Sequence, residues 1–142
     1  MFDHEKLDVY QASLLFVSWV YQRVDRQKGH FRHARDELIR ASQSIPRNIA
    51  EGNGKSSLAD RGRFFEIARG SALECAAILD ELQIMKALEV NETIEGKKIL
   101  HRIVNMLTKM LKPVQKIRED SPGYSAGSGE YDYEHDYEHE HE

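Results

Sequence analysis

The strictest repeat in the chain lies in residues 64–85, FFEIARGSALECAAILDELQIM. Apolar or small residues recur there at alternating steps of four and three, at Phe64, Ala68, Ser71, Cys75, Ile78, Leu82 and Met85. This spacing places all seven side chains on one face of an α-helix. Because Ala68, Ser71 and Cys75 are small, a neighbouring helix can approach closely along that part of the face. We therefore expect this stretch to form one helix of a helical bundle.

Three further stretches with few helix breakers show the same period. The first carries an apolar row at Leu7, Tyr10, Leu14, Val17, Tyr21 and Val24. The second covers about residues 31–51, with an inner face formed by Leu38, Ala41, Ser42, Ile45 and Ile49. The last follows Asn91 and carries Ile99, Ile103, Met106, Leu107, Met110, Val114 and Ile117. Four amphipathic helices without an alternating strand pattern predict an all-α fold, an antiparallel up-down four-helix bundle over residues 1–118.

Local signals set expectations for the ends and interruptions of these helices. Pro46 removes a backbone donor and crowds the carbonyl of Ser42, so the second helix is expected either to kink or to restart with Ser44 as its cap. Ser57, followed three residues later by Asp60, is typical of a capping box at the start of the next helix. Asn91, followed by glutamates, suits the start of the last helix.

Length and composition bound the class of protein. The chain has 142 residues, 40% hydrophobic and 31% charged, which fits one globular domain rather than a membrane protein. Its single cysteine, Cys75, excludes an internal disulfide and fits a reducing compartment. The N-terminus lacks the basic-then-apolar order of a signal peptide, and the longest nearly apolar run, Leu14–Tyr21, is too short to span a bilayer. These features predict a cytoplasmic protein that does not enter a membrane.

Residues 119–142 form an acidic segment rich in Tyr, His and Glu. They contain nine acidic residues and no Lys or Arg, whereas residues 1–118 carry a net charge of +5. The segment repeats Asp-Tyr-Glu-His and lacks the aliphatic residues needed to offset the entropy of ordering, so we expect a disordered tail. Its histidines, His135, His139 and His141, suggest weak chelation of Zn²⁺, Ni²⁺ or Cu²⁺, but solvation or electrostatic attraction to the basic body is the favoured interpretation.

Two stripes of basic residues are the most informative surface feature. The predicted nucleic-acid-binding residues are Arg32, Arg40 and Arg47 on the second helix, and Lys98, Arg102, Lys109, Lys112 and Lys116 on the last. Each set falls on one side of its helix, and residues 97–118 contain seven basic residues and no acidic one. An ordinary solvated helix face is the alternative, but the absence of acids favours contact with a phosphate backbone.

Apolar residues outside the helix rows predict self-association. They are Val9, Phe16, Trp19 and Val20 on the first helix, and Leu73, Ala77, Ile84 and Leu88 on the third. A bundle helix needs only one apolar stripe, so we expect these extra residues to form an interface between copies of the chain.

No pattern in the helices predicts an active site, a metal site or a cofactor. Gly54-Lys55-Ser56 resembles the end of a phosphate-binding loop, but the remainder of that motif is missing. Glu89, Glu92 and Glu95 repeat at steps of three without a matching second acidic set, so we interpret them as helix-start acids. Cys75 has no histidine on its helix face and is expected to be a core residue rather than a nucleophile. We therefore expect a protein that is not an enzyme.

The segments SIPRNIAEG at 44–52 and RFFEIARGSALE at 63–74 resemble the 23S rRNA-intervening-sequence proteins, a bacterial family of four-helix bundles. The resemblance covers roughly residues 2–118; it departs from the family's small-residue run at 69–73 and at Gly62, where a better helix former is expected. It implies a homo-oligomer, typically a homopentamer, without enzymatic activity. A related branch, the accessory variability determinant of diversity-generating retroelements, binds nucleic acid and a reverse transcriptase through a basic oligomer surface.

The sequence therefore predicts a non-enzymatic oligomeric bundle that binds an RNA or DNA backbone through its basic surface, with no cofactor. The alternative is a scaffold for protein–protein interaction without nucleic acid, and a reverse transcriptase or another protein is then the candidate partner. Salt dependence separates the two hypotheses, because phosphate contacts weaken steeply as salt rises and an apolar interface does not.

Overall fold

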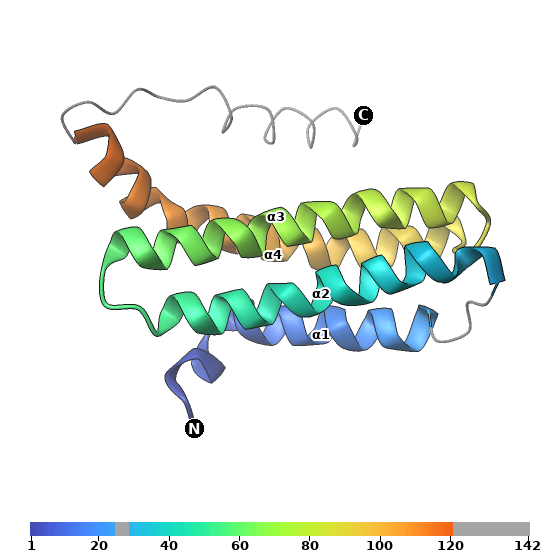
Figure 1. The fold of residues 1–142 in the computed structure, drawn as a ribbon, viewed down its shortest axis with the longest axis horizontal. Coiled ribbons are helices and arrows are strands. Elements are labelled where there is room, and N and C mark those ends of the chain that lie inside the picture. The colour runs from blue at the N-terminus through green and yellow to red at the C-terminus, as the bar shows by residue number, and fades with distance from the viewer. Residues whose placement is uncertain (25–28, 121–142) are drawn as a thin grey trace.

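The computed structural model describes residues 1–24 and 29–120, and α-helices dominate that part of the chain (Figure 1). Its elements are the short 3₁₀ helices η1 (Asp3–Lys6) and η2 (Gly29–Phe31) and the α-helices α1 (Asp8–Val24), α2 (Arg32–Asn53), α3 (Leu58–Ile84) and α4 (Val90–Asp120). The described residues contain no strand. The predicted all-α class is therefore confirmed.

The α-helices run alternately up and down around one core. α2 packs against α1 and α3, and α4 packs against the same two helices, so α2 and α4 occupy opposite corners of the bundle (Figure 1). Contacts between helix ends fix the antiparallel sense. Arg23 at the end of α1 pairs with Glu92 and Glu95 at the start of α4, at 3.4 Å in both cases. The predicted up-down four-helix bundle is confirmed.

The central pattern of α3 agrees with the sequence. Ala68, Cys75, Ile78 and Leu82 are buried, whereas Phe64 and Ser71 are half-buried and Met85 is exposed. The hydroxyl of Ser57 accepts a hydrogen bond of 3.1 Å from the backbone N–H of Asp60, which confirms the predicted cap. At α4 the predicted start is displaced, because the helix begins at Val90 and the Glu92 carboxylate accepts from the backbone N–H of Glu89.

α2 is continuous through its proline. All five residues predicted for its inner face are buried, namely Leu38, Ala41, Ser42, Ile45 and Ile49. The helix runs from Arg32 to Asn53 with Pro46 inside it, so the predicted restart at Ser44 is wrong. The Ser44 hydroxyl lies instead 2.9 Å from the Ser71 hydroxyl of α3, and the Asn48 amide donates to it. Contact with α3 holds the helix together at the point where one backbone hydrogen bond is lost.

The face of α1 that enters the core differs from the predicted one. Val24 is buried as expected, but Leu14 and Tyr21 are 41% and 66% exposed. The buried face carries Val9, Ala12, Phe16, Trp19 and Val20, and the rings of Phe16 and Trp19 stack with centroids 5.8 Å apart. The periodic row at Leu7, Tyr10 and Val17 is only half-buried.

Two glycines leave space that a neighbouring helix fills with a side chain. A Cβ placed at Gly96 of α4 would lie 2.7 Å from Cη2 of Trp19, so the indole occupies the space left by the missing side chain. A Cβ at Gly62 of α3 would lie 2.6 Å from Cγ1 of Val114 in α4. Such distances are too short for real atoms, which explains why glycine stands at position 62 in place of a better helix former. The fit of Trp19 against Gly96 also gives the physical reason why α1 turns this face inward.

The end of the bundle lies slightly beyond the predicted boundary. α4 continues to Asp120, so Glu119 and Asp120 belong to the helix rather than to the acidic tail. The predicted disordered tail otherwise falls on residues 121–142, which lie outside the described residues, as do its three histidines.

Candidate nucleic-acid interface

The basic stripe of α4 lies on the outer side of the helix. Its members are exposed, and they are Lys98, Arg102, Lys109, Lys112 and Lys116. The opposite side carries the buried residues Leu100, Ile103, Leu107 and Leu111, which face the core. At a rise of about 1.5 Å per residue the stripe extends along roughly 27 Å of the helix axis. The structure therefore brings these five predicted residues onto one continuous surface.

The five cations of the α4 stripe have no partners among residues 1–24 and 29–120. None of them takes part in an ion pair or a side-chain hydrogen bond there. The cations that flank the stripe behave differently. Lys97 pairs with Asp80 of α3 at 2.6 Å, and Arg118 pairs with Glu66 of α3. The flanking cations thus help to join α4 to α3, whereas the stripe itself is left with uncompensated positive charge.

The basic stripe of α2 is shorter and less uniform. Arg32, Arg40 and Arg47 are exposed and form no ion pair within the described part of the chain. Asp36 lies between Arg32 and Arg40 along the helix, and its carboxylate pairs with Arg35 at 3.1 Å. The acid lowers the local positive potential of this stripe, so α4 offers the stronger field.

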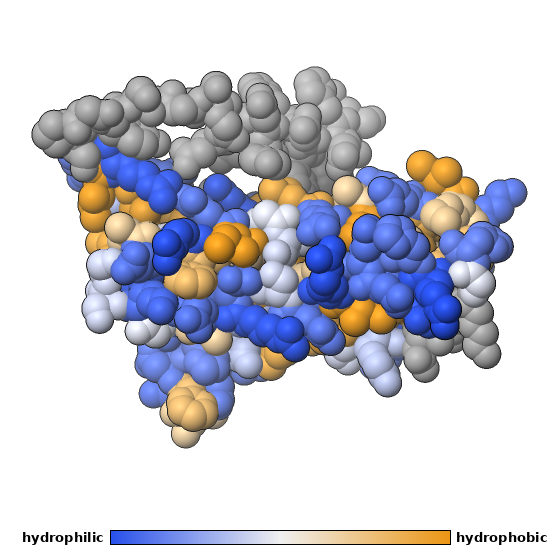
Figure 2. Space-filling model, in the orientation of Figure 1, coloured by the Kyte–Doolittle hydropathy of each residue, from blue (hydrophilic) through white to orange (hydrophobic). Residues whose placement is uncertain are grey.

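The structure separates the two stripes. α2 and α4 lie at opposite corners of the bundle (Figure 1). Because the residues of each stripe are exposed on the outer side of their helix, the two stripes point away from each other. On the face shown in Figure 2, hydrophobic side chains are interspersed with hydrophilic ones. The eight predicted binding residues therefore form two surfaces on one chain rather than a single site.

The predicted oligomer interface is wrong at five of its eight positions. Val9, Phe16, Trp19, Val20 and Leu88 are at most 5% exposed in the single chain. They belong to the core of the bundle and have no surface left to offer another copy. The other three predicted interface residues keep accessible surface: Leu73 is half-buried, Ala77 is exposed and Ile84 is 80% exposed.

The glutamates at the start of α4 and the Cys75 thiol have structural roles in the bundle. Glu92 and Glu95 pair with Arg23, and this contact joins α4 to α1. Within the described residues, no group of three or more His, Cys, Asp or Glu side chains is arranged to hold a metal ion. Cys75 is buried, and burial, aided by the nearby charge of Glu74, raises the pKa of its thiol. The thiol is therefore protonated at neutral pH, in line with its predicted core position.

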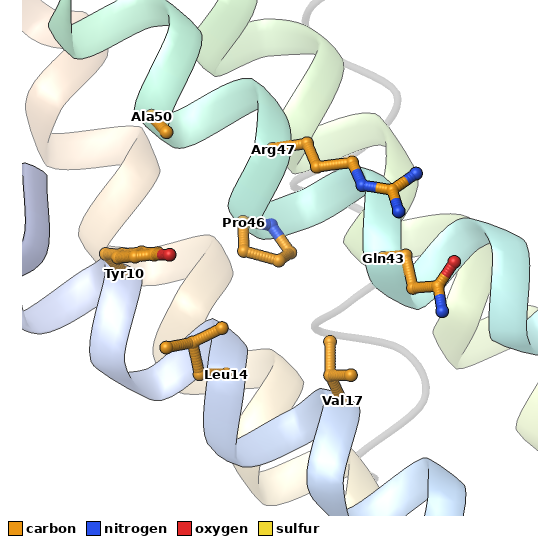
Figure 3. Close-up of a pocket in the computed structure, with 7 residues that line it drawn as sticks. All are labelled: Tyr10, Leu14, Val17, Gln43, Pro46, Arg47 and Ala50. Atoms are coloured by element: carbon orange, nitrogen blue, oxygen red, sulfur yellow. The ribbon is translucent and has the colours of Figure 1, made fainter.

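The sequence did not indicate a groove between α1 and α2. Tyr10, Leu14 and Val17 of α1 face Gln43, Pro46, Arg47 and Ala50 of α2 (Figure 3). These seven residues line a groove whose volume is about 320 Å³. Leu14 and Val17 belong to the row assigned from the sequence to the core. The signal for this groove in the sequence was the second apolar face of α1. A helix with two apolar faces buries one of them in the core of its bundle and leaves the other exposed.

The fold defines this chain as an all-helical four-helix-bundle protein. It belongs to the family of 23S rRNA-intervening sequence proteins, whose family model matches residues 5–109. The resemblance seen in the sequence is thus confirmed.

Among solved structures, the chain is similar to a protein with unknown function from the S23 ribosomal protein family of Bacteroides thetaiotaomicron VPI-5482, determined at 1.70 Å resolution. The TM-score is 0.67 at 23% sequence identity, and the match covers 73% of this chain and 98% of the other. At this identity the similarity concerns the fold alone. None of the curated proteins matches the sequence.

No helix in the described ranges combines the length and apolar character that crossing a bilayer requires. The cytoplasmic location inferred from the sequence stays a prediction.

Proposed function

We propose that this protein binds the phosphate backbone of RNA or DNA through the α4 stripe, without catalysing a reaction. The observation that carries the proposal is the set of five exposed cations, Lys98 to Lys116, that no described acidic residue neutralises. Phosphates would neutralise them and release condensed counterions, which is the main source of non-specific affinity for nucleic acids. α4 contains no Phe, Tyr or Trp, so extensive base stacking is not expected from this surface.

Salt titration of binding tests the proposal. With five phosphate contacts, the logarithm of the binding constant should fall with the logarithm of salt concentration with a slope of about −4.5 for duplex DNA and about −3.5 for a single strand. Dissociation constants on the order of 10⁻⁴ to 10⁻⁶ M at physiological salt are typical of such binding. We would measure fluorescence anisotropy with the full chain and short labelled duplex and single-stranded probes.

Paired variants make the test specific to α4. The double variant Lys109→Gln, Lys112→Gln should reduce the magnitude of the duplex slope by about 1.8, because two phosphate contacts are lost. The control Lys6→Gln removes an exposed cation of η1, outside both stripes, and should leave the slope unchanged. A slope near zero, or equal slopes for the double variant and the control, would exclude the α4 stripe as a nucleic-acid interface.

A scaffold for protein–protein interaction is the second candidate function. Large apolar side chains that remain exposed favour it, among them Ile84, Tyr21 and Leu15. A protein partner, including the reverse transcriptase implied by the resemblance, would cover such residues. Binding through them should change little with salt, in contrast to binding through the α4 stripe.

We also propose that copies of this chain associate with one another, which would strengthen nucleic-acid binding through the α4 stripe. Ala77 and Ile84 are seven residues apart on α3 and both exposed, so they lie on one side of that helix. A second copy packed on this side would bury Ile84, and several copies would present several α4 stripes to one nucleic acid. The resemblance implies five copies.

A further inference from the structure

The groove between α1 and α2 has an apolar floor and a polar edge. Tyr10, Leu14 and Val17 from one side and Pro46 and Ala50 from the other form the floor. Figure 3 shows Pro46 pointing toward α1, whereas Gln43 and Arg47 lie together at one edge of the opening. Leu14 is 41% exposed, so an apolar ligand in this groove would remove solvent-accessible hydrocarbon from water.

The polar edge is available for a ligand. The side chains of Gln43 and Arg47 form no ion pair or side-chain hydrogen bond with any residue in the ranges 1–24 and 29–120. Arg40 is also exposed and without an ion-pair partner there, and it lies two helical turns before Arg47 on the same side of α2. The groove therefore suits a segment that combines apolar rings with carboxylates.

The C-terminal segment of the chain has this composition. Residues 121–142 contain Tyr124, Tyr131, Tyr133 and Tyr137, together with seven acidic residues and no Lys or Arg. Tyrosine offers a large apolar ring that can still keep its hydroxyl in water, and a carboxylate is the preferred partner of a guanidinium group. The α4 stripe offers this segment cations, whereas the α1–α2 groove adds an apolar floor to the cations at its edge, so the tyrosines favour the groove.

The position of the chain end makes this contact accessible. α1 and α4 are antiparallel neighbours, with the end of α1 beside the start of α4. With Arg23 beside Glu92 and Glu95, Tyr10 and Leu14 lie level with the middle of α4, about 20–30 Å of helix axis before its end at Asp120. The 22 residues that follow Asp120 reach on the order of 70 Å when extended, which is enough to return along the bundle and pass around α1, since packed helices are separated by about 8–10 Å.

We propose that residues 121–142 bind in the α1–α2 groove of their own chain, with tyrosine rings on the Leu14 and Val17 floor and carboxylates on Arg47 and Arg40. The proposal is independent of nucleic-acid binding, because it concerns the corner of the bundle opposite to the α4 stripe. Its consequence is that the C-terminal segment leaves the cations of α4 open.

Paramagnetic relaxation in the full-length chain tests this contact. Ser128→Cys introduces a thiol for a nitroxide spin label, while Cys75 is buried and its raised thiol pKa keeps it unreactive. We expect the label to broaden the backbone amide signals of Leu14, Val17 and Ala50 more strongly than those of Lys109 and Lys112. Reduction of the nitroxide in the same sample restores the signals and gives the reference intensities.

Variants of the groove sharpen the result. Arg47→Glu should abolish most of the broadening by repelling the carboxylates, and Leu14→Ser should weaken it by removing part of the floor. Lys109→Glu, the same kind of charge reversal at the opposite corner, should leave it unchanged. Far-ultraviolet circular dichroism of each variant checks that the helices persist, and both groove residues are partly or fully exposed.

Three outcomes would overturn the proposal. The first is broadening that is strongest along the α4 stripe, and the second is broadening at no described residue. The third is broadening of the same strength when a spin-labelled chain is mixed with an isotope-labelled chain that carries no spin label, since the contact then joins two copies. The salt dependence of nucleic-acid binding is measured separately with the Lys109→Gln, Lys112→Gln variant, so failure of this proposal can be distinguished from failure of the proposed function.

Discussion

At the scale of single residues, Gly62 and Gly70 of α3 have opposite surroundings. A Cβ at Gly62 would meet Val114, whose branched side chain has little freedom to move away. A Cβ at Gly70 would meet nothing within 4 Å. Both glycines lower the intrinsic stability of the helix. Only at Gly62 does the missing side chain allow a neighbouring residue, Val114, to pack close to the helix.

Alanine substitutions at these two glycines should therefore shift stability in opposite directions. Gly62→Ala should lower the free energy of unfolding by about 1–3 kcal/mol through overpacking, despite the better helix propensity of alanine. Gly70→Ala should raise it by up to about 1 kcal/mol. Urea denaturation followed by circular dichroism measures both changes.

A second substitution separates overpacking from other causes. Val114→Ala in the Gly62→Ala background should recover part of the loss, because it removes the atoms that collide with the new Cβ. If Gly62→Ala and Gly70→Ala stabilise the protein equally, the close approach of α3 and α4 at Gly62 is incorrect.

At the scale of elements, the end of α3 carries an unusual residue. Lys86 has a φ of 62°, which lies in the left-handed region that glycine normally occupies. The backbone N–H of Ala87 donates to the Leu82 carbonyl at 2.8 Å, and that of Lys86 donates to the Gln83 carbonyl at 3.0 Å. This pair of hydrogen bonds is the Schellman motif, which ends the helix and turns the chain toward α4.

Lys86→Gly should stabilise the protein by about 0.5–1 kcal/mol. Relief of the left-handed strain, about 1–2 kcal/mol for a residue with a Cβ, outweighs the greater entropy that glycine loses on folding. Thermal unfolding gives the change, and Lys86→Ala serves as the control because it removes the charge but keeps the Cβ. Equal stabilisation by glycine and alanine would mean that charge, not backbone strain, limits stability at this position.

At the scale of the whole molecule, one chain cannot present both basic stripes to one surface. α2 and α4 lie at opposite corners, so Arg40 and Lys109 face different directions. Only a second copy could place an α2 stripe beside an α4 stripe. The exposed side of α3 is the surface we propose for that contact.

Ile84→Glu should weaken self-association of the chain, because it places a charge where we expect a second copy to bury an isoleucine that is 80% exposed. Sedimentation velocity over a concentration series measures the mass of the particle. Ile94→Glu is the matched control on α4, where the isoleucine is also exposed, and it should leave the mass unchanged. A wild-type particle with the mass of one chain at all concentrations would contradict the proposed oligomer.

Sequence patterns were enough to predict the fold class, the inner face of α2, four buried positions of α3, the cap at Ser57 and the exposure of the basic stripes. These features follow from periodicity and local chemistry, which act within one helix. Charged side chains such as Lys109 are costly to bury, so their place on the surface is also a local property.

Packing between helices selects the face of α1 that enters the core and sets how the two stripes are placed relative to each other. α1 has two apolar faces of similar strength, and the fit of Trp19 into the space beside Gly96 selects one of them. That contact joins residues far apart in the chain, so periodicity within α1 cannot reveal it. The groove lined by Leu14 and Pro46 has the same origin, because it forms from the apolar face of α1 that the core does not use.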